Sequence, residues 1–216
     1  MTVATRAGRI PAVRSVFLAL VGFAFFLFYG NSVAHAQAGG VFDDGARRLA
    51  GHGLPLALFL TGAGRFPVFA VLCVALLIFG FVRRRYLGVV AVPVVALIVA
   101  WKVSDFFKDL FARPRPEYWI AIHETSAAYP SGHAVLALTF YGLLAYALRR
   151  TQPPSPQRSV LIGLAAFWIL ATGWSRLAVG AHFVSDVLGG YLLGACFVLL
   201  GSIAIDRFAA PTKAAT

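Results

Sequence analysis

The sequence predicts an all-α integral membrane protein, and three observations favour this fold class. Of its 216 residues, 60% are hydrophobic and only 12% are charged, whereas a soluble domain carries about 25% charged residues. The apolar residues gather into six runs, each approaching the roughly 20 residues that a helix needs to span a bilayer. Basic residues lie between these runs rather than along one polar face, as is typical of membrane flanks. We therefore expect a bundle of six transmembrane helices.

The expected spans cover residues 15–33, 56–82, 87–104, 134–148, 160–174 and 183–205. The second is long enough to be tilted or to begin with a surface turn, and the fourth and fifth are short, so their ends must include polar residues. A proline-rich loop, residues 151–158, separates the fourth span from the fifth. We expect one domain over residues 1–216, with cytoplasmic tails at about 1–14 and 206–216.

The net charge of +11 raises the possibility of a nucleic-acid partner, which the placement of the basic residues argues against. Eleven of the 19 basic residues flank alternate ends of the spans: Arg6, Arg9, Arg14, Arg83, Arg84, Arg85, Arg149, Arg150, Arg158, Arg207 and Lys213. Cytoplasmic loops carry such an excess of Lys and Arg. The segments at residues 105–130 and 176–182 should then face outward, and the membrane is the expected partner.

The first span has an alternative interpretation as a secretory signal. Basic residues, an apolar run over residues 16–29 and then the sequence VAHAQA resemble a signal peptide with its cleavage site. We expect a retained helix, because the apolar run can extend through Val33. Cleavage would leave the other five helices oriented as before.

One outward segment places an acid close to a histidine. Asp186 lies in an otherwise apolar run, where an acid costs roughly 2.5–3.5 kcal/mol at the centre of a membrane helix and usually has a partner. His182 precedes it by four residues, which would place both on one helix face. Asp186 could hold one imidazole nitrogen and leave the other as a nucleophile or a ligand.

Two kinds of site could use this pair. One is a metal site with His182, Asp186 and His133 as ligands; the other is an anion site in which histidine attacks an electrophile. The topology places three cations on the same outer face, Lys108, Arg115 and Arg176. They would repel a divalent metal and attract a phosphate, so we predict an anion site without a metal ion. The remaining charged loop residues, Arg113, Glu117, His123 and Glu124, are expected to form an ordinary outer loop.

The sequence PSGH at residues 130–133 precedes the fourth span. Pro130 ends the preceding segment, and Ser131 is a good N-cap. A helix beginning at Gly132 would present free backbone N–H groups and a positive dipole end to an anion. Capping does not explain His133, which is therefore a candidate functional residue.

Three motifs carry a resemblance to a known family. Lys108 followed by six residues and Arg115–Pro116 matches KxxxxxxRP, residues 130–133 read PSGH, and Ser175 to Asp186 matches SRxxxxxHxxxD. Together, in this order and on one membrane face, they resemble the signature of the type-2 phosphatidic acid phosphatase superfamily, in its integral membrane branch. Every motif position is filled, and the resemblance covers the chain from about Asp43 onward.

The resemblance implies a role for each motif residue. His182 would attack phosphorus and form a phosphohistidine, Asp186 would orient it, and His133 would protonate the leaving oxygen and then help water. The phosphate oxygens would be held by Lys108, Arg115, Arg176, Ser131 and the backbone N–H of Gly132. Three cations can supply the charge stabilisation in place of magnesium, so no metal and no cofactor is expected.

A site at the outer membrane edge favours a phosphate on a lipid anchor. We expect undecaprenyl diphosphate first, with phosphatidylglycerophosphate, phosphatidate or a lipid A phosphate as alternatives, and a bacterial inner membrane with the active site facing the periplasm or exterior. Vanadium haloperoxidases resemble the same anion site but are soluble. A non-catalytic transporter or scaffold would be expected to lack some motif residues. Gly190 and Gly194 suit close helix packing, expected within the bundle, and the sequence leaves the oligomeric state open.

Overall fold

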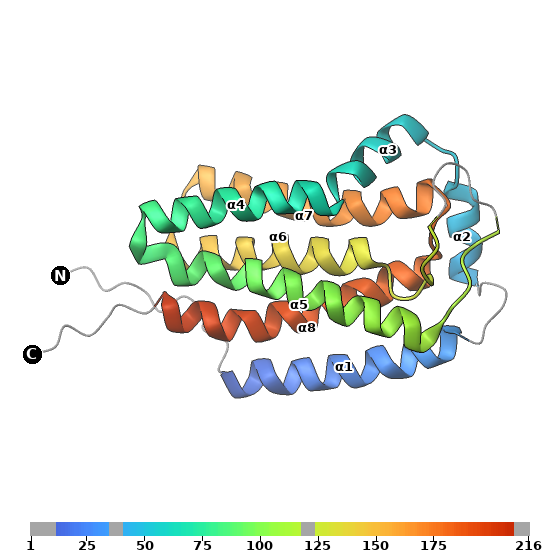
Figure 1. Ribbon diagram of the computed structural model, residues 1–216, viewed down its shortest axis with the longest axis horizontal. Coiled ribbons are helices and arrows are strands. Elements are labelled where there is room, and N and C mark those ends of the chain that lie inside the picture. The colour runs from blue at the N-terminus through green and yellow to red at the C-terminus, as the bar shows by residue number, and fades with distance from the viewer. Residues whose placement is uncertain (1–11, 35–40, 118–123, 210–216) are drawn as a thin grey trace, which may run out of the picture.

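The fold was obtained as a computed structural model, which describes residues 12–34, 41–117 and 124–209 (Figure 1). Within these ranges the chain forms helices and no strand. The elements are α1 (Ala12–Ala34), α2 (Val41–Leu49), α3 (Leu54–Ala63), α4 (Phe66–Val82), the 3-10 turn η1 (Arg84–Tyr86), α5 (Leu87–Phe111), α6 (Gly132–Thr151), α7 (Pro156–Ala178) and α8 (Val184–Phe208). The all-helical expectation is confirmed. The expected tails fall mostly outside the described residues.

The expected number of six membrane-spanning helices is not confirmed exactly. Among the described residues, four helices are long and apolar enough to cross a membrane: Ala12–Ala34, Arg84–Phe111, Pro156–Ala178 and Val184–Phe208. A fifth span is possible if α3 and α4, which meet at a bend of 45°, are taken as one. The expected second span is thus broken at residues 64–65, where Pro67 in the first turn of α4 cannot donate a backbone N–H to a continuous helix.

Helix α6 does not meet the same criterion of length and apolar composition for a span. Its enclosed position explains why it can be less apolar than the other helices. It packs against α5, α7 and α8, and it lies near the centre of the bundle in Figure 1. Phe140 and Leu143 in its middle are fully buried. A helix enclosed by other helices faces protein rather than lipid, so it can carry polar residues at both ends. His133 and Arg150 occupy these two ends.

Two glycines allow α8 to approach α6 closely. A methyl group on Gly190 would lie 2.7 Å from the carbonyl oxygen of Ser131 and 2.8 Å from Cβ of Ala134. A methyl group on Gly194 would lie 3.0 Å from Cβ of Leu138. The expected packing of these glycines within the bundle is confirmed. It holds the start of α8 against the start of α6.

Helix α1 packs along α8 and contributes an aromatic residue to the core. Phe26 is fully buried, and its ring centroid lies 4.9 Å from that of Phe107 and 5.5 Å from that of Tyr129. The Tyr129 hydroxyl donates a hydrogen bond of 3.1 Å to the carbonyl oxygen of Phe26. These contacts connect α1 to the segment that leads into α6.

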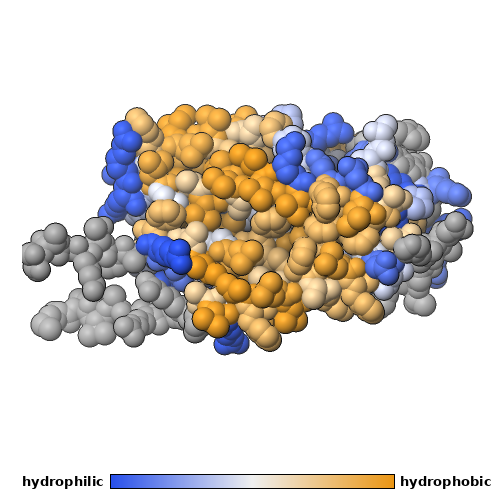
Figure 2. Space-filling view, turned by 60° about the horizontal axis from the view of Figure 1, so that its bottom comes forward, coloured by the Kyte–Doolittle hydropathy of each residue, from blue (hydrophilic) through white to orange (hydrophobic). Residues whose placement is uncertain are grey.

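The polar residues of the bundle gather at its two ends, with apolar surface between them (Figure 2). At one end α6 and α8 are joined by an ion pair of 2.5 Å between Arg150 and Asp206, and Gln152 donates to the Tyr86 hydroxyl at 3.5 Å. The basic turn η1 lies at this end. The opposite end holds α2, the α5–α6 connection and the α7–α8 connection (Figure 1).

The outward segment begins later than expected. Helix α5 continues beyond residue 104 to Phe111, so Lys108 lies in its last turn rather than in a loop. The helix ends at Phe111, and the C-cap residue Ala112 adopts a left-handed conformation with φ of 46°; Pro114 follows. Because the backbone of Lys108 is helical, the position of its side chain is fixed more firmly than a loop would allow.

Candidate active site

The residues of the three motifs meet at this second end of the bundle. Lys108 comes from α5, Arg115 from the α5–α6 connection, Arg176 from the end of α7, and His182 from the α7–α8 connection. Ser131, Gly132 and His133 begin α6, and Asp186 lies in the first turn of α8. The Ser131 N–H donates to the backbone carbonyl of Asp186 at 3.0 Å, which connects two of the motifs directly.

The expected contact between His182 and Asp186 is present, although the two residues do not lie on one helix as expected. Nδ1 of His182 lies 3.4 Å from Oδ2 of Asp186, and both side chains are buried. Helix α8 begins at Val184, so His182 precedes the helix instead of lying on its face. The same Oδ2 accepts the backbone N–H of Phe183 at 2.9 Å, which fixes the carboxylate at the helix start.

The other nitrogen of His182 faces a cation. Nη1 of Arg115 lies 3.1 Å from Nε2 of His182. A guanidinium can only donate, so Nε2 accepts with its lone pair, and the ring proton belongs on Nδ1, toward Asp186. Burial first, and then the charges of Arg115, Arg176 and Lys108, hold the pKa of His182 well below its ordinary value of 6.5. The imidazole is therefore neutral near pH 7.

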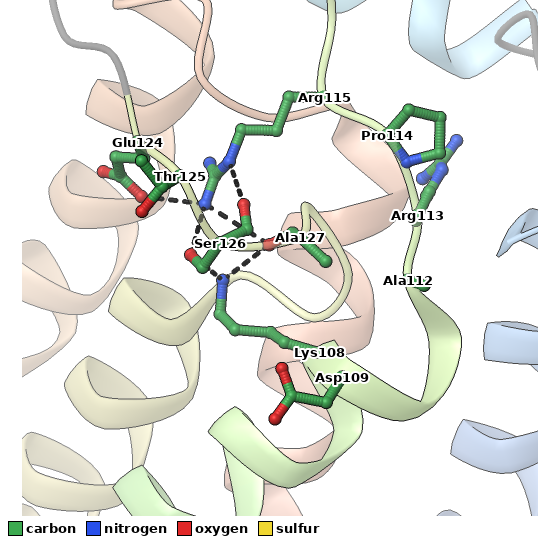
Figure 3. Close-up of a pocket in the computed structure, with 10 residues that line it drawn as sticks. All are labelled: Lys108, Asp109, Ala112, Arg113, Pro114, Arg115, Glu124, Thr125, Ser126 and Ala127. Atoms are coloured by element: carbon green, nitrogen blue, oxygen red, sulfur yellow. Dashed lines mark hydrogen bonds and ion pairs between the residues drawn. The ribbon is translucent and has the colours of Figure 1, made fainter.

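Two cations are held side by side by a turn of the α5–α6 connection (Figure 3). Nζ of Lys108 donates to the carbonyl oxygen of Ala127 at 2.8 Å and to Oγ of Ser126 at 3.3 Å. Nε of Arg115 donates to the carbonyl oxygen of Ser126 at 2.7 Å. These carbonyl oxygens offset the repulsion between the two cations. A cavity of about 500 Å³ opens beside them, lined also by Asp109 and Glu124.

Glu124 connects two of the expected phosphate-binding residues. One carboxylate oxygen lies 2.8 Å from Nη2 of Arg115, and the other accepts from Nη2 of Arg176. Burial alone would raise the pKa of Glu124, but the charges of Arg176 and Arg115 outweigh it and lower that pKa. The expectation that Glu124 belongs to an ordinary outer loop is wrong, because its carboxylate lies between two cations of the site.

Arg113 also departs from that expectation. Its side chain is 1% exposed, and Nη1 donates to Oδ1 of Asp186 at 2.5 Å and to Oγ of Ser185 at 2.7 Å. Nη2 lies 3.1 Å from Oδ2 of Asp43 in α2. Glu117 is exposed, as an ordinary loop residue would be, and His123 lies outside the described residues.

His133 lies beside the break between α3 and α4. A methyl group on Gly64 would lie 3.1 Å from Cδ2 of His133 and 3.1 Å from Cγ2 of Thr172. A larger residue at position 64 would therefore press on the histidine. The bend in the broken span, which the sequence did not predict, thus places Gly64 against the His133 ring.

Several buried donors of the site make no hydrogen bond within the part of the chain that the structure describes. They are Oγ of Ser131, Nε2 of His133, Nδ1 of His182, Nε of Arg113, and Nε and Nη1 of Arg176; Nδ1 of His182 has only its 3.4 Å contact with Asp186. Buried polar groups normally have partners, and donors near fixed cations suit the oxygens of a bound anion. No group of three or more His, Cys, Asp or Glu side chains that could hold a metal ion occurs among the described residues.

Fold and site together define a multi-pass helical membrane protein with a cationic, histidine-containing site at one end of its bundle. A family model described as the PAP2 superfamily matches residues 89–208. The chain belongs to this superfamily, which confirms the resemblance carried by the three motifs. The matched range includes each of the motif residues.

A solved structure shows the same fold. The crystal structure of a transmembrane PAP2-type phosphatidylglycerolphosphate phosphatase from Bacillus subtilis superposes with a TM-score of 0.75 and 23% identity, over 89% of this chain and 96% of that one. At this identity the likeness concerns the fold alone.

Two curated relatives are similar over parts of their length. The chain is 36% identical over 93 residues to phosphatidylglycerophosphatase B of Bacillus subtilis, covering 43% of this chain and 46% of that protein. It is 30% identical over 145 residues to undecaprenyl-diphosphatase of Sulfolobus acidocaldarius, covering 64% of each. The chain thus spans about half to two thirds of the length of these relatives.

Proposed function

We propose that this protein hydrolyses a phosphate or diphosphate from a membrane lipid, without a metal ion, through a phosphohistidine intermediate on His182. The observation that carries the proposal is the environment of His182. Its Nδ1 faces Asp186 at 3.4 Å, and its Nε2 accepts from Arg115 at 3.1 Å. A neutral imidazole held in this tautomer has its lone pair on the nitrogen that lies among the cations.

In the first step, Nε2 of His182 attacks phosphorus and the bond from phosphorus to the leaving oxygen breaks. Asp186 holds Nδ1–H and compensates the positive charge that the ring gains, as carboxylates do in nucleophile triads. His133, in its protonated form, donates a proton to the leaving oxygen and becomes neutral. In the second step, water attacks phosphorus, His133 accepts a proton from it, and the P–N bond breaks to release inorganic phosphate and neutral His182.

Charge on the transferring phosphoryl group is met by fixed donors. Lys108, Arg115 and Arg176 supply three cations, and Ser131 and the backbone N–H of Gly132 add donors at the start of α6. Phosphoryl transfer depends chiefly on positioning and charge stabilisation. Lys108 and Arg115 are positioned by Ser126 and Ala127, so this arrangement exists before substrate binds. We expect activity to persist in the presence of a chelator.

The substrate class follows from where the site lies. The site is at the end of a bundle that exposes many large apolar side chains along its helices, as the face in Figure 2 shows. A phosphate at the membrane surface can therefore reach the cations while its hydrocarbon anchor stays in lipid. We propose undecaprenyl diphosphate as the first candidate, and the relative from Sulfolobus acidocaldarius bears that activity in its name. A phosphoglycerolipid such as phosphatidylglycerophosphate is the second candidate, supported by the more identical relative from Bacillus subtilis. Phosphatidate and lipid A phosphates stay in the panel to be tested.

We further propose that the site faces the periplasm or the exterior of a bacterial inner membrane. The basic residues of η1 and Arg149, Arg150 and Arg158 lie at or beside the connections of the opposite end. An excess of Lys and Arg in short loops marks the cytoplasmic side. This orientation would expose the site to lipid phosphates of the outer leaflet.

The proposed activity is tested by phosphate release from a panel of lipid phosphates, using detergent-solubilised protein with and without EDTA. The His182→Ala variant is measured beside the wild type, and its folding is checked by its thermal unfolding transition. We expect release by the wild type alone, unchanged by EDTA. Equal release by folded His182→Ala protein, or loss of wild-type release in EDTA, would contradict the proposal.

A further inference from the structure

Arg113 stands between two buried carboxylates at the site. Its guanidinium lies 2.5 Å from Oδ1 of Asp186 and 3.1 Å from Oδ2 of Asp43, and all three side chains are at most 6% exposed. Asp43 lies outside the three motifs, and Arg113 falls at an unspecified position of KxxxxxxRP. A buried charge is costly unless it is paired and hydrogen-bonded, so this group of charges must form together or not at all.

The contacts divide the two oxygens of Asp186 between different tasks. Oδ1 is held by Arg113, whereas Oδ2 accepts the N–H of Phe183 at 2.9 Å and faces Nδ1 of His182 at 3.4 Å. A carboxylate held at only one oxygen can rotate about its bond to the side chain. The contact with Arg113 removes that freedom and keeps Oδ2 directed at His182.

Asp43 holds Arg113 in turn. Oδ1 of Asp43 accepts from the backbone N–H of Ser185 at 3.1 Å and from Oγ of Ser185 at 2.9 Å. Asp43 therefore connects α2 to the first turn of α8, where Asp186 lies. The ring of Phe183 lies 4.5 Å from Cζ of Arg113, a cation–π contact that further restricts the guanidinium.

Charge supports the same assignment. Asp43 and Asp186 carry two negative charges and Arg113 one positive charge, so the group has one negative charge left over. During the proposed reaction the imidazole of His182 gains a positive charge beside Asp186. The charges of Arg113 and Asp43 cancel each other, so the negative charge of Asp186 balances the positive charge that His182 gains.

We propose that Arg113 and Asp43 are positioning residues, which act on the reaction through the Asp186 carboxylate and the orientation of His182. This inference rests on the proposed function, since it concerns the same nucleophile. Neither residue is assigned a contact with the substrate. Arg113 should therefore affect the rate of the chemical step and leave substrate binding largely unchanged.

The test compares kcat and KM of wild-type protein with Arg113→Lys and Asp43→Asn, using the fastest lipid of the panel. Lysine keeps the charge but loses the planar fork that contacts two carboxylates. We expect kcat to fall roughly 10- to 100-fold in Arg113→Lys, as when a partner that orients a reactive group is lost. We expect KM to change less than about threefold, because the phosphate-binding cations are untouched.

The matched control is Arg150→Lys at the opposite end of the bundle. Arg150 and Asp206 also form a partly enclosed pair at 2.5 Å, so the same substitution removes a contact between a guanidinium and a carboxylate away from the site. We expect its kcat to stay within about twofold of the wild type. An equal loss of kcat in Arg150→Lys and Arg113→Lys would overturn the inference, because any disturbed ion pair would then have the same effect.

A double-mutant cycle separates positioning from a general structural role. If Arg113 acts through Asp186, then Arg113→Lys should lower the residual kcat of Asp186→Asn by less than about threefold. If the kcat of the double variant instead fell by the product of the two single-variant losses, the two residues would act independently and the inference would be contradicted. If Arg113→Lys fails to fold, the Asp43→Asn variant tests the proposal instead. A wild-type kcat in Asp43→Asn would overturn the proposal, whereas a reduced kcat at unchanged KM would support it. Activity retained by His182→Ala would instead refute the proposed function itself.

Discussion

Nη1 of Arg115 lies 3.1 Å from Nε2 of His182, so a donor occupies the lone pair that would attack phosphorus. The same Nη1 donates to the carbonyl oxygen of Ala181 at 2.8 Å, the residue just before His182. A phosphate oxygen is a stronger acceptor for a guanidinium than a neutral imidazole. We therefore expect substrate binding to draw this N–H to the phosphate and to free Nε2 next to phosphorus.

This relationship predicts the protonation of His182. A lowered pKa keeps a histidine neutral until the pH falls to that value, so His182 should carry its single proton on Nδ1 throughout the range from pH 8 to below 6.5, its ordinary value. Nitrogen NMR of histidine-labelled protein distinguishes the two tautomers and the imidazolium. The chain has five histidines, so comparison with His182→Ala assigns the signal. An imidazolium signal for His182 with a midpoint at or above 6.5 would refute this tautomer argument.

Removal of the Glu124 charge should strengthen phosphate binding. In the structure its carboxylate contacts Arg115 and Arg176, where it competes with an incoming phosphate for the same donors. We expect Glu124→Gln to lower the inhibition constant of inorganic phosphate roughly 10-fold, because more of the protein is then competent to bind it.

Glu117→Gln is the control for this change. Glu117 is an exposed residue of the same connection, and its substitution alters the net charge equally. The inhibition constant of inorganic phosphate for Glu117→Gln should therefore match that for the wild type. Weaker phosphate binding by Glu124→Gln would mean that the carboxylate supports the site instead of competing for it.

The contact between α6 and α8 should be needed for activity. In Gly190→Ala the new methyl group would meet the carbonyl of Ser131 and Cβ of Ala134 at under 3 Å, which must push the two helices apart. Small errors in the positions of reacting groups cost much, so we expect kcat to fall roughly 10- to 100-fold. In Gly163→Ala the methyl group meets nothing within 4 Å, and kcat should be unchanged. Equal activities of the two variants would contradict this account of how the site is assembled.

Helix α1 should contribute to stability through Phe26. The ring is fully buried, so Phe26→Ala should destabilise the protein by about 3 kcal/mol. Phe28 in the same helix is 69% exposed in the bundle and faces outward, so Phe28→Ala should have little effect. Thermal unfolding in detergent measures both. If the first segment were removed as a signal peptide, neither substitution would alter the mature protein, and the retained helix would be refuted.

The parts of the site that the sequence predicted are those with a local signal. Asp186 is recognisable because an acid in an apolar run needs a partner, and His182 is close to it in sequence. Lys108 and Arg115 are recognisable by their spacing and their outward position. For these residues the structure shows the proximity that the motifs predict, including the contact of Arg115 with His182.

The residues that the sequence did not predict make contacts between distant segments. Arg113 contacts Asp43 across 70 positions and Asp186 across 73, and Glu124 contacts Arg176 across 52 positions. A charged residue in a loop looks the same in the sequence whether it is solvated or buried against such a partner. Only the packing of α2, α7 and α8 decides between these outcomes.

The fold was predictable in class and less so in detail. Apolar composition established the helical membrane bundle, but the break between α3 and α4 required attention to Pro67, and the enclosure of α6 depends on its neighbours. The extension of α5 to Phe111 was hidden because its last turns carry Asp105, Lys108 and Asp109. Charged residues at such spacing predict a loop, and only the structure shows that Lys108 among them is buried and bonded to Ser126 and Ala127.

The measurement that tests the central claim most directly is a search for the phosphohistidine. Protein is mixed briefly with a lipid phosphate labelled at phosphorus and then denatured in alkali, in which a phosphohistidine survives and a phosphoserine does not. We predict label on the peptide that contains His182, formed equally in EDTA and missing from His182→Ala. Label on another residue, or full turnover by His182→Ala, would contradict His182 as the nucleophile.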